Sequence, residues 1–101
     1  MPGIDLTFHP LATAELEAAF DWYLEKSERA ATHFMAEIAR AIESISKNPK
    51  MYAESSEGIR RCVVHRFPFL VVYRAKNKQI QVLAFAHGRR RPGYWIDRLK
   101  H

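Results

Sequence analysis

The residues best suited to chemistry form a basic and aromatic group in the C-terminal half of the chain. The group contains arginines, one histidine and two aromatic residues: Arg60, Arg61, Arg66, His87, Arg89, Arg90, Arg91, Tyr94, Trp95 and Arg98. Guanidinium groups bind phosphates and carboxylates through a planar fork and keep their charge at neutral pH. Such a group binds RNA when the aromatic rings stack on bases. It is equally suited to an acidic protein surface.

The charge of the chain is divided between its two halves. Residues 1–57 contain 5 Lys/Arg and 10 Asp/Glu, whereas residues 58–101 contain 11 Lys/Arg and a single acid, Asp97. This asymmetry favours an acidic or polyanionic partner that meets one face of the fold. The alternative is a solvated basic surface, which many small domains have.

Individual residues of the basic group allow two interpretations. His87 is the member that titrates near neutral pH, so it suits acid–base chemistry, but a hydrogen-bonded structural role is equally compatible. For Tyr94 and Trp95, packing of the C-terminal segment onto a sheet is favoured over base stacking. Cys62 lies within a strand pattern and is predicted to be a small buried hydrophobe rather than a nucleophile.

Other kinds of chemistry have little support in the sequence. The five histidines lack metal-ligand spacing, and the four glycines form no phosphate-binding loop, so we expect no metal and no cofactor. A lone cysteine makes no internal disulfide. There is no apolar run of about 18 residues, and Met1–Pro10 does not have the features of a secretion signal. The expected location is therefore the cytoplasm.

The N-terminal half predicts a strand followed by two helices. Ile4–Phe8 alternates apolar and polar residues, as a half-buried strand does. From Pro10 to about Lys26 the apolar residues have helical spacing, and the acids, Glu15 among them, are expected to face away from the core. Ser27 is a predicted N-cap for a second helix, which ends at Asn48-Pro49. Helices joined so closely should form an antiparallel hairpin.

The C-terminal half predicts three strands. Ile59–Phe67, Phe69–Arg74 and Gln79–His87 are rich in β-forming residues. In the last of them one face is expected to carry Ile80, Val82, Ala84 and Ala86, and the strand to be central because both faces are apolar. Pro92–His101 has the length of a short terminal helix. We therefore predict a single α+β domain over residues 1–101, with a helical hairpin on an antiparallel sheet in the order β-α-α-β-β-β.

Several short motifs follow one another in a recognisable order. They are His9-Pro10-Leu11-Ala12, Asp21-Trp22-Tyr23, Asn48-Pro49, Ile59-Arg60-Arg61, Arg66-Phe67-Pro68-Phe69-Leu70-Val71-Val72-Tyr73, Val82-Leu83-Ala84-Phe85-Ala86-His87-Gly88-Arg89-Arg90, Pro92-Gly93-Tyr94-Trp95 and Arg98. The ordered set resembles the RelE/ParE superfamily of toxins from bacterial type II toxin–antitoxin modules, over nearly the whole chain. The segments around Pro68 and His87 look more like the ParE branch.

The resemblance to the ParE branch implies a growth-inhibiting toxin, associated with plasmid stabilisation, that poisons DNA gyrase and is not an enzyme. Its target-binding residues would come from the basic group: Arg60, Arg61, Arg89, Arg90, Arg91, Tyr94, Trp95 and Arg98. A cognate antitoxin encoded next to it would lay apolar residues in the groove between hairpin and sheet and carboxylates on the arginines.

Membership of the RelE branch would imply a different activity. RelE-like toxins are metal-independent ribonucleases that cut mRNA on the ribosome. Arg61, His87, Arg89 and Tyr94 would then supply the electrostatic and acid–base groups. A third alternative is an inactive member of the family that is kept for antitoxin binding or plasmid addiction.

Overall fold

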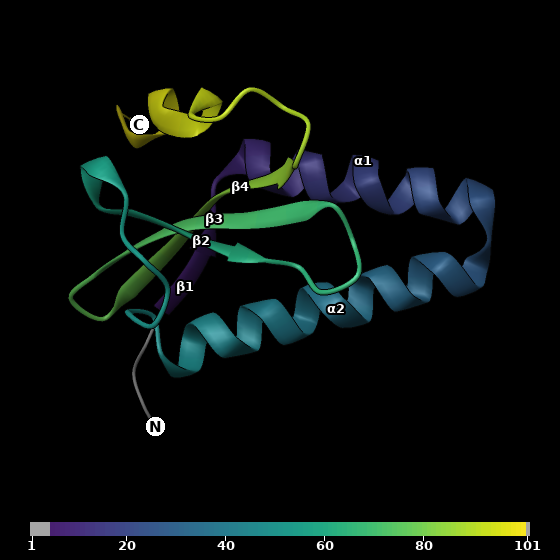
Figure 1. Cartoon of the computed structure of the whole chain (residues 1–101), viewed down its shortest axis with the longest axis horizontal. Coiled ribbons are helices and arrows are strands. Elements are labelled where there is room, and N and C mark those ends of the chain that lie inside the picture. The colour runs from purple at the N-terminus through teal and green to yellow at the C-terminus, as the bar shows by residue number, and fades with distance from the viewer. Residues whose placement is uncertain (1–4, 101) are drawn as a thin grey trace.

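Two helices cover one face of a four-stranded sheet, and a short C-terminal helix lies against the other face (Figure 1). The computed structural model describes residues 5–100. The elements are β1 (Asp5–Phe8), α1 (Pro10–Lys26), α2 (Glu28–Lys47), the 3₁₀ turn η1 (Ser56–Gly58), β2 (Ile59–Val63), β3 (Phe69–Lys76), β4 (Gln79–His87) and the 3₁₀ helix η2 (Tyr94–Lys100). The predicted fold class and element order are confirmed.

A single extended residue, Ser27, separates the two helices. Its backbone N–H donates to the Tyr23 carbonyl at 2.9 Å and ends α1, while its Oγ accepts from the Ala30 N–H at 2.9 Å and begins α2. With φ −172° and ψ 145°, Ser27 turns the chain back on itself, so α1 and α2 pack as the predicted hairpin. Asn48 ends α2, as expected from the sequence.

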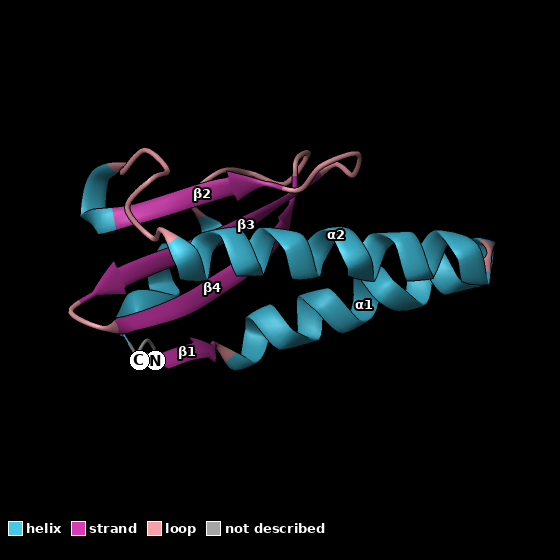
Figure 2. Ribbon diagram, turned by 90° about the horizontal axis from the view of Figure 1, so that it is seen from below, coloured by secondary structure: helices cyan, strands magenta, loops and turns pink. Residues whose placement is uncertain are grey.

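The sheet order is β1-β4-β3-β2, which places β4 and β3 in the centre. β2, β3 and β4 are antiparallel, but β1 pairs with β4 in parallel, so the sheet is mixed rather than wholly antiparallel. The helical hairpin explains the difference. It returns the chain to the end of the sheet at which β1 began, so β2 runs in the direction of β1 (Figure 2). Two reversals later, β4 has that direction again.

A bulge in β4 changes which residues face the helices. Tyr73 pairs with Val82 and Val72 pairs with Ala84, which leaves Leu83 as an extra residue. One extra residue inverts the alternation beyond it. The predicted face of Ile80, Val82, Ala84 and Ala86 is therefore wrong in its second half. Phe85 shares the helix-side core with Val82, whereas Leu83, Ala84 and Ala86 belong to the core on the far side.

β2 is shorter and β3 is longer than predicted. The Val64 N–H donates to the Phe69 carbonyl at 2.9 Å, and Arg66 adopts a positive φ of 70°, so the chain already turns where Ile59–Phe67 was expected to continue. β3 extends to Lys76 because the next turn is made tightly at Asn77, which tolerates its φ of 58°. Ile4 and His101, the ends of two predicted elements, lie outside the described residues.

The larger core fills the space between the hairpin and the sheet. Tyr23 of α1 stacks on Phe34 of α2 with ring centroids 4.9 Å apart, and Phe67 and Phe69 meet Phe34 edge-on at 5.3 and 5.4 Å. These four rings hold the hairpin on the sheet at the end where β4 finishes. The helix layer is thereby fixed beside the residues that follow β4.

A smaller core lies on the other face of the sheet. Trp95 of η2 is only 5% exposed and packs with Ile59, Val72 and Leu83. The expected packing of the C-terminal segment onto the sheet is confirmed, and so is the short terminal helix. η2 therefore covers β4 on the far face, while both long helices lie on the near face.

Candidate functional site

Beyond the end of β1, the backbone groups at the edge of β4 form hydrogen bonds with two side chains instead of with a strand. β1 pairs with β4 only as far as Phe8. Further along, the Phe85 N–H donates to Glu15 Oε1 at 3.0 Å, and the Leu83 carbonyl accepts from Arg98 Nη1 at 2.8 Å. Buried backbone groups require partners. α1 and η2 supply them where β1 is too short.

Glu15 anchors the C-terminal segment. Arg98 donates from Nη1 to Oε1 at 3.0 Å and from Nη2 to Oε2 at 2.9 Å, and the Tyr94 hydroxyl donates to Oε2 at 2.8 Å. The side chains of Arg98 and Glu15 are 11% and 16% exposed, so the pair is largely shielded from water. Burial and the hydrogen bond to Glu15 raise the pKa of Tyr94 to about 12. The phenol is therefore a permanent donor at neutral pH.

Arg90 also lies near Glu15, but its ion pair with this carboxylate is weak. Its guanidinium lies 4.0 Å above the Tyr94 ring, and its Nη1 is 4.0 Å from Glu15 Oε2, at the outer limit of an ion pair. Its side chain is 55% exposed. Because one carboxylate serves two guanidinium groups and Arg98 takes both of its oxygens, a positive charge remains at this point of the surface.

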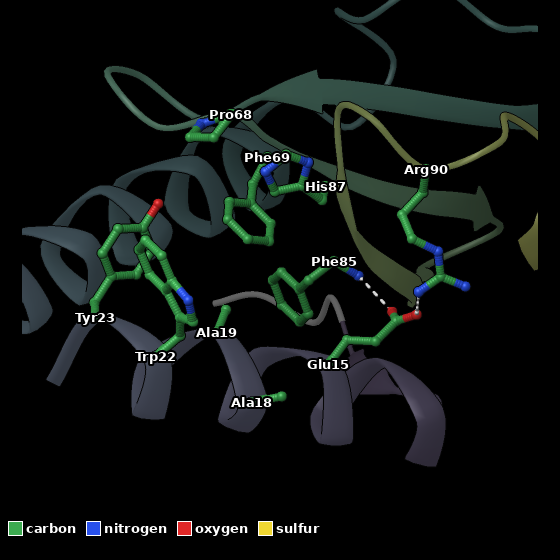
Figure 3. A pocket seen from close by; sticks show the side chains of 10 residues that line it. All are labelled: Glu15, Ala18, Ala19, Trp22, Tyr23, Pro68, Phe69, Phe85, His87 and Arg90. Atoms are coloured by element: carbon green, nitrogen blue, oxygen red, sulfur yellow. Dashed lines mark hydrogen bonds and ion pairs between the residues drawn. The ribbon is translucent and has the colours of Figure 1, made fainter. Parts of the chain in front are cut away.

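An apolar groove of about 490 Å³ opens beside this charge, between α1 and the ends of β3 and β4 (Figure 3). Its wall and floor carry aromatic rings, with Arg90 and Glu15 at one end. The lining residues are Glu15, Ala18, Ala19, Trp22, Tyr23, Pro68, Phe69, Phe85, His87 and Arg90. Trp22 is 54% exposed. A large exposed aromatic side chain on the wall of a groove is typical of a protein-binding site.

Three residues of the predicted target-binding set have structural roles. Arg60 donates to the Tyr52 carbonyl at 2.6 Å and to Glu54 at 3.1 Å, with 15% of its side chain exposed. Arg98 is held by Glu15, and Trp95 is buried in the far-side core. Their side chains contact the protein itself, and for Trp95 this agrees with the packing that the sequence favours.

The basic residues lie on separate elements of the fold. Arg60 and Arg61 belong to β2, an edge strand two strands away from β4, and Arg61 is level with Ala84. Arg89 lies in the segment that follows β4. Arg61, Arg74, Arg89 and Arg91 are exposed, and among residues 5–100 none of their side chains has an ion pair or hydrogen bond.

The residues of the alternative ribonuclease site do not converge. His87 Nδ1 accepts from the Arg89 backbone N–H at 3.0 Å, and the Tyr94 hydroxyl is engaged by Glu15. Arg61 is level with Ala84 and two strands away from β4, a separation of roughly 10 Å before its distance from His87 along the strand is added. The hydrogen-bonded interpretation of His87 therefore agrees with the structure.

Glu15 and Trp22 are the site residues that sequence reasoning missed. Glu15 was expected to face away from the core, but it points at β4 because the sheet edge there lacks a strand. One signal was available: the C-terminal half has a single acid, so buried arginines from it require a carboxylate from the first half. The position of that carboxylate depends on the packing of α1 against β4.

Residues 5–100 contain neither a membrane-spanning helix nor a cluster of metal ligands. No helix in this range is long and apolar enough to cross a membrane. No three side chains among its His, Cys, Asp and Glu residues are grouped so that they could hold a metal ion.

Comparison with solved structures supports the fold. The chromosomal ParDE toxin–antitoxin system of P. aeruginosa contains a similar chain, with a TM-score of 0.71 and 25% sequence identity. The similarity covers 83% of this chain and 95% of that one. No protein of curated function matches the sequence.

The fold and the sequence together define a toxin of a type II toxin–antitoxin module. The family described as "ParE toxin of type II toxin-antitoxin system, parDE" matches residues 6–92. The chain belongs to this ParE family, which confirms the predicted resemblance. An antitoxin partner follows from membership. The Tyr94–Lys100 segment, which Glu15 anchors, lies beyond the matched residues.

Proposed function

We propose that this ParE toxin arrests growth by inhibiting DNA gyrase in the cytoplasm, and that its antitoxin neutralises it. Membership of the ParE family is the observation that carries the proposal. The exposed cations Arg61, Arg89 and Arg91 are available for the target. Residues 1–101 act as one domain in this proposal.

The arrangement of side chains supports gyrase inhibition over mRNA cleavage. A ribonuclease needs a base, an acid and cations within reach of one phosphate. Tyr94 is committed to Glu15, and Arg61 lies two strands from β4. A toxin that acts by binding requires no such convergence.

Two assays test the target. Purified toxin should inhibit supercoiling by gyrase, and it should leave mRNA intact on programmed ribosomes. A variant with Arg89 and Arg91 replaced by alanine should keep its fold and inhibit more weakly, because neither side chain has a partner within residues 5–100. Ribosome-dependent mRNA cleavage without an effect on supercoiling would refute the proposal in favour of the RelE-like activity.

We assign the antitoxin to the apolar groove. An amphipathic antitoxin segment would place an apolar side chain against Trp22 and Phe69 and a carboxylate on Arg90. The charge of Arg90, which Glu15 compensates only in part, lies beside an apolar floor and fits that combination. Filling the groove would also cover a Trp22 side chain that is now half exposed.

The docking site is tested by a pair of α1 variants. Trp22→Ala should weaken antitoxin binding by about tenfold or more, because exposed aromatic anchors dominate such interfaces. Leu24→Ala is the matched control, since Leu24 is 43% exposed on the same helix but does not line the groove. Equal affinities of the two variants, measured by calorimetry with the purified antitoxin, would exclude the groove.

A further inference from the structure

The far face of the sheet has an exposed surface beside η2, on strands β2 and β3. We define the far-face surface as Arg61, Val63, Leu70 and Arg74. Val63 pairs with Leu70, and Arg61 pairs with Val72, which is two residues before Arg74. All four therefore lie on neighbouring strands with their side chains on the face opposite the helices.

The far-face surface has an aliphatic centre and basic surroundings. Val63 is 71% exposed, and Leu70 beside it is half-buried. Arg61 and Arg74 are exposed and have no partner among the described residues. The acids on segments next to this surface are Glu54, which is paired with Arg60, Glu57 of η1 and Asp97 of η2. Unneutralised arginines around apolar side chains match the composition of a protein-binding surface.

The adjoining edge of the sheet is open in the second half of β2, because Glu54 forms an isolated β-bridge with Arg60 beside the first half. β2 is an edge strand, and the Ile59 carbonyl points outward to the Ser55 N–H at 2.7 Å. Alternate residues share that direction, so the N–H and C=O groups of Arg61 and Val63 also point away from β3. An open edge with backbone donors and acceptors extends the contact that a partner protein can make.

We infer that the far-face surface docks an acidic protein surface of the toxin's target, on the opposite side of the sheet from the antitoxin groove. This inference rests on the proposed function and adds to it where the target is met. The chemistry favours protein over nucleic acid, because a base-binding surface needs accessible aromatic rings. Trp95 is buried and Tyr94 is engaged by Glu15, while the exposed rings of Phe8 and Trp22 belong to β1 and α1.

A charge-reversal pair tests the inference. The double variant Arg61→Glu/Arg74→Glu should need about tenfold more toxin, or more, to arrest growth and to inhibit supercoiling, because it opposes an acidic surface. It should still bind the antitoxin. Arg40→Glu/Lys47→Glu makes the same change in net charge on α2, where both side chains are about three-quarters exposed, and should keep its toxicity. Circular dichroism would verify that both variants are folded.

Each outcome decides the inference. Equal loss of toxicity in both double variants would indicate a general effect of net charge and overturn it, as would loss of antitoxin binding together with toxicity in the far-face variant. Val63→Thr keeps the shape and adds a hydroxyl, so it should weaken inhibition through a protein contact. If that variant is unaffected while the arginine variant loses affinity for a DNA duplex alone, the partner is nucleic acid and the inference is wrong.

A growth assay distinguishes a failure of this inference from a failure of the gyrase assignment. If the wild-type chain arrests growth without inhibiting gyrase, the assignment of gyrase fails, and the comparison of double variants still decides whether the far-face surface meets the target. If the wild-type chain does not arrest growth, there is no target to dock, and both are overturned.

Discussion

Replacing Glu15 by alanine removes the acceptor that α1, β4 and η2 share. Arg98 would lose its acidic partner, the Tyr94 hydroxyl would lose its acceptor, and the Phe85 N–H would lose the bond that completes the edge of β4. The variant therefore leaves the charge of Arg98 without a carboxylate, with only its hydrogen bond to the Leu83 carbonyl among those described, and it leaves two donors without acceptors in a region that is largely shielded from water.

The size of the effect follows from the burial of the pair. Removing one member of a buried ion pair costs about 3–5 kcal/mol of unfolding free energy, because an uncompensated charge stays behind. Since 11% of Arg98 and 16% of Glu15 are exposed, water can reach the remaining charge, and we expect the lower end of that range. A loss of about 3 kcal/mol is a large part of the roughly 5–15 kcal/mol that stabilises a typical domain.

The assay is equilibrium unfolding in urea, with Glu43→Ala as the control. Glu43 pairs with Lys47 at 3.6 Å on the surface of α2, where the two side chains are 66% and 76% exposed. Removing such a pair should cost about 0.3–0.5 kcal/mol. Glu15→Gln, which keeps one carbonyl oxygen but loses the charge, should fall between the two.

A double-mutant cycle tests whether Arg98 is the residue that depends on Glu15. Glu15→Ala and Arg98→Met should be strongly non-additive, with a coupling energy of about 2 kcal/mol, because residues in one hydrogen-bonded network share their energy. Measured losses for Glu15→Ala and Glu43→Ala that agree within about 0.5 kcal/mol would refute the idea that Glu15 anchors the C-terminal segment.

Three further expectations concern stability. Trp95→Ala should cost about 3–5 kcal/mol in urea unfolding, because the ring is buried between η2 and the sheet, and a loss below about 1 kcal/mol would contradict that packing. Burial raises the pKa of Tyr73 and Tyr94 to about 12 from 10.0, so the unfolded phenols ionise first. The melting temperature should therefore hold below about pH 10 and fall as the pH approaches 12, less steeply in Tyr94→Phe; a pH-independent melting temperature would refute this. Ser27→Ala should cost about 1 kcal/mol in thermal unfolding, against almost nothing for Ser46→Ala within α2, because only Ser27 caps a helix.

The helices were predictable because their boundaries depend on local chemistry. Pro10 suits a first helical turn, and the Ser27 hydroxyl caps α2 whatever the rest of the chain does. The β4 boundaries also followed from the sequence, as an apolar run that ends in a turn. Local pattern did not reveal the extra residue at Leu83, because a bulge depends on the register with β3.

For the basic group, too, the sequence predicted the composition but not the arrangement in space. The sequence established that the arginines outnumber the acids in the second half, but the sheet places Arg61 on β2, two strands away from β4, which Arg89 follows. Composition does not reveal this separation, because it contains no information on strand order. Partners distant in sequence then decided which arginines stay exposed, since Glu54 and Glu15 engage Arg60 and Arg98.

By itself the sequence determined the class of fold, the helical hairpin and the family, because residue periodicity, capping residues and motif order are properties of neighbouring positions. Only the tertiary structure decided the groove at Trp22, the anchoring role of Glu15 and the exposure of Val63. The physical reason is that β1 is too short to cover β4. The open edge draws a carboxylate from α1 and an arginine from η2, 83 residues apart in the chain, into one hydrogen-bonded site.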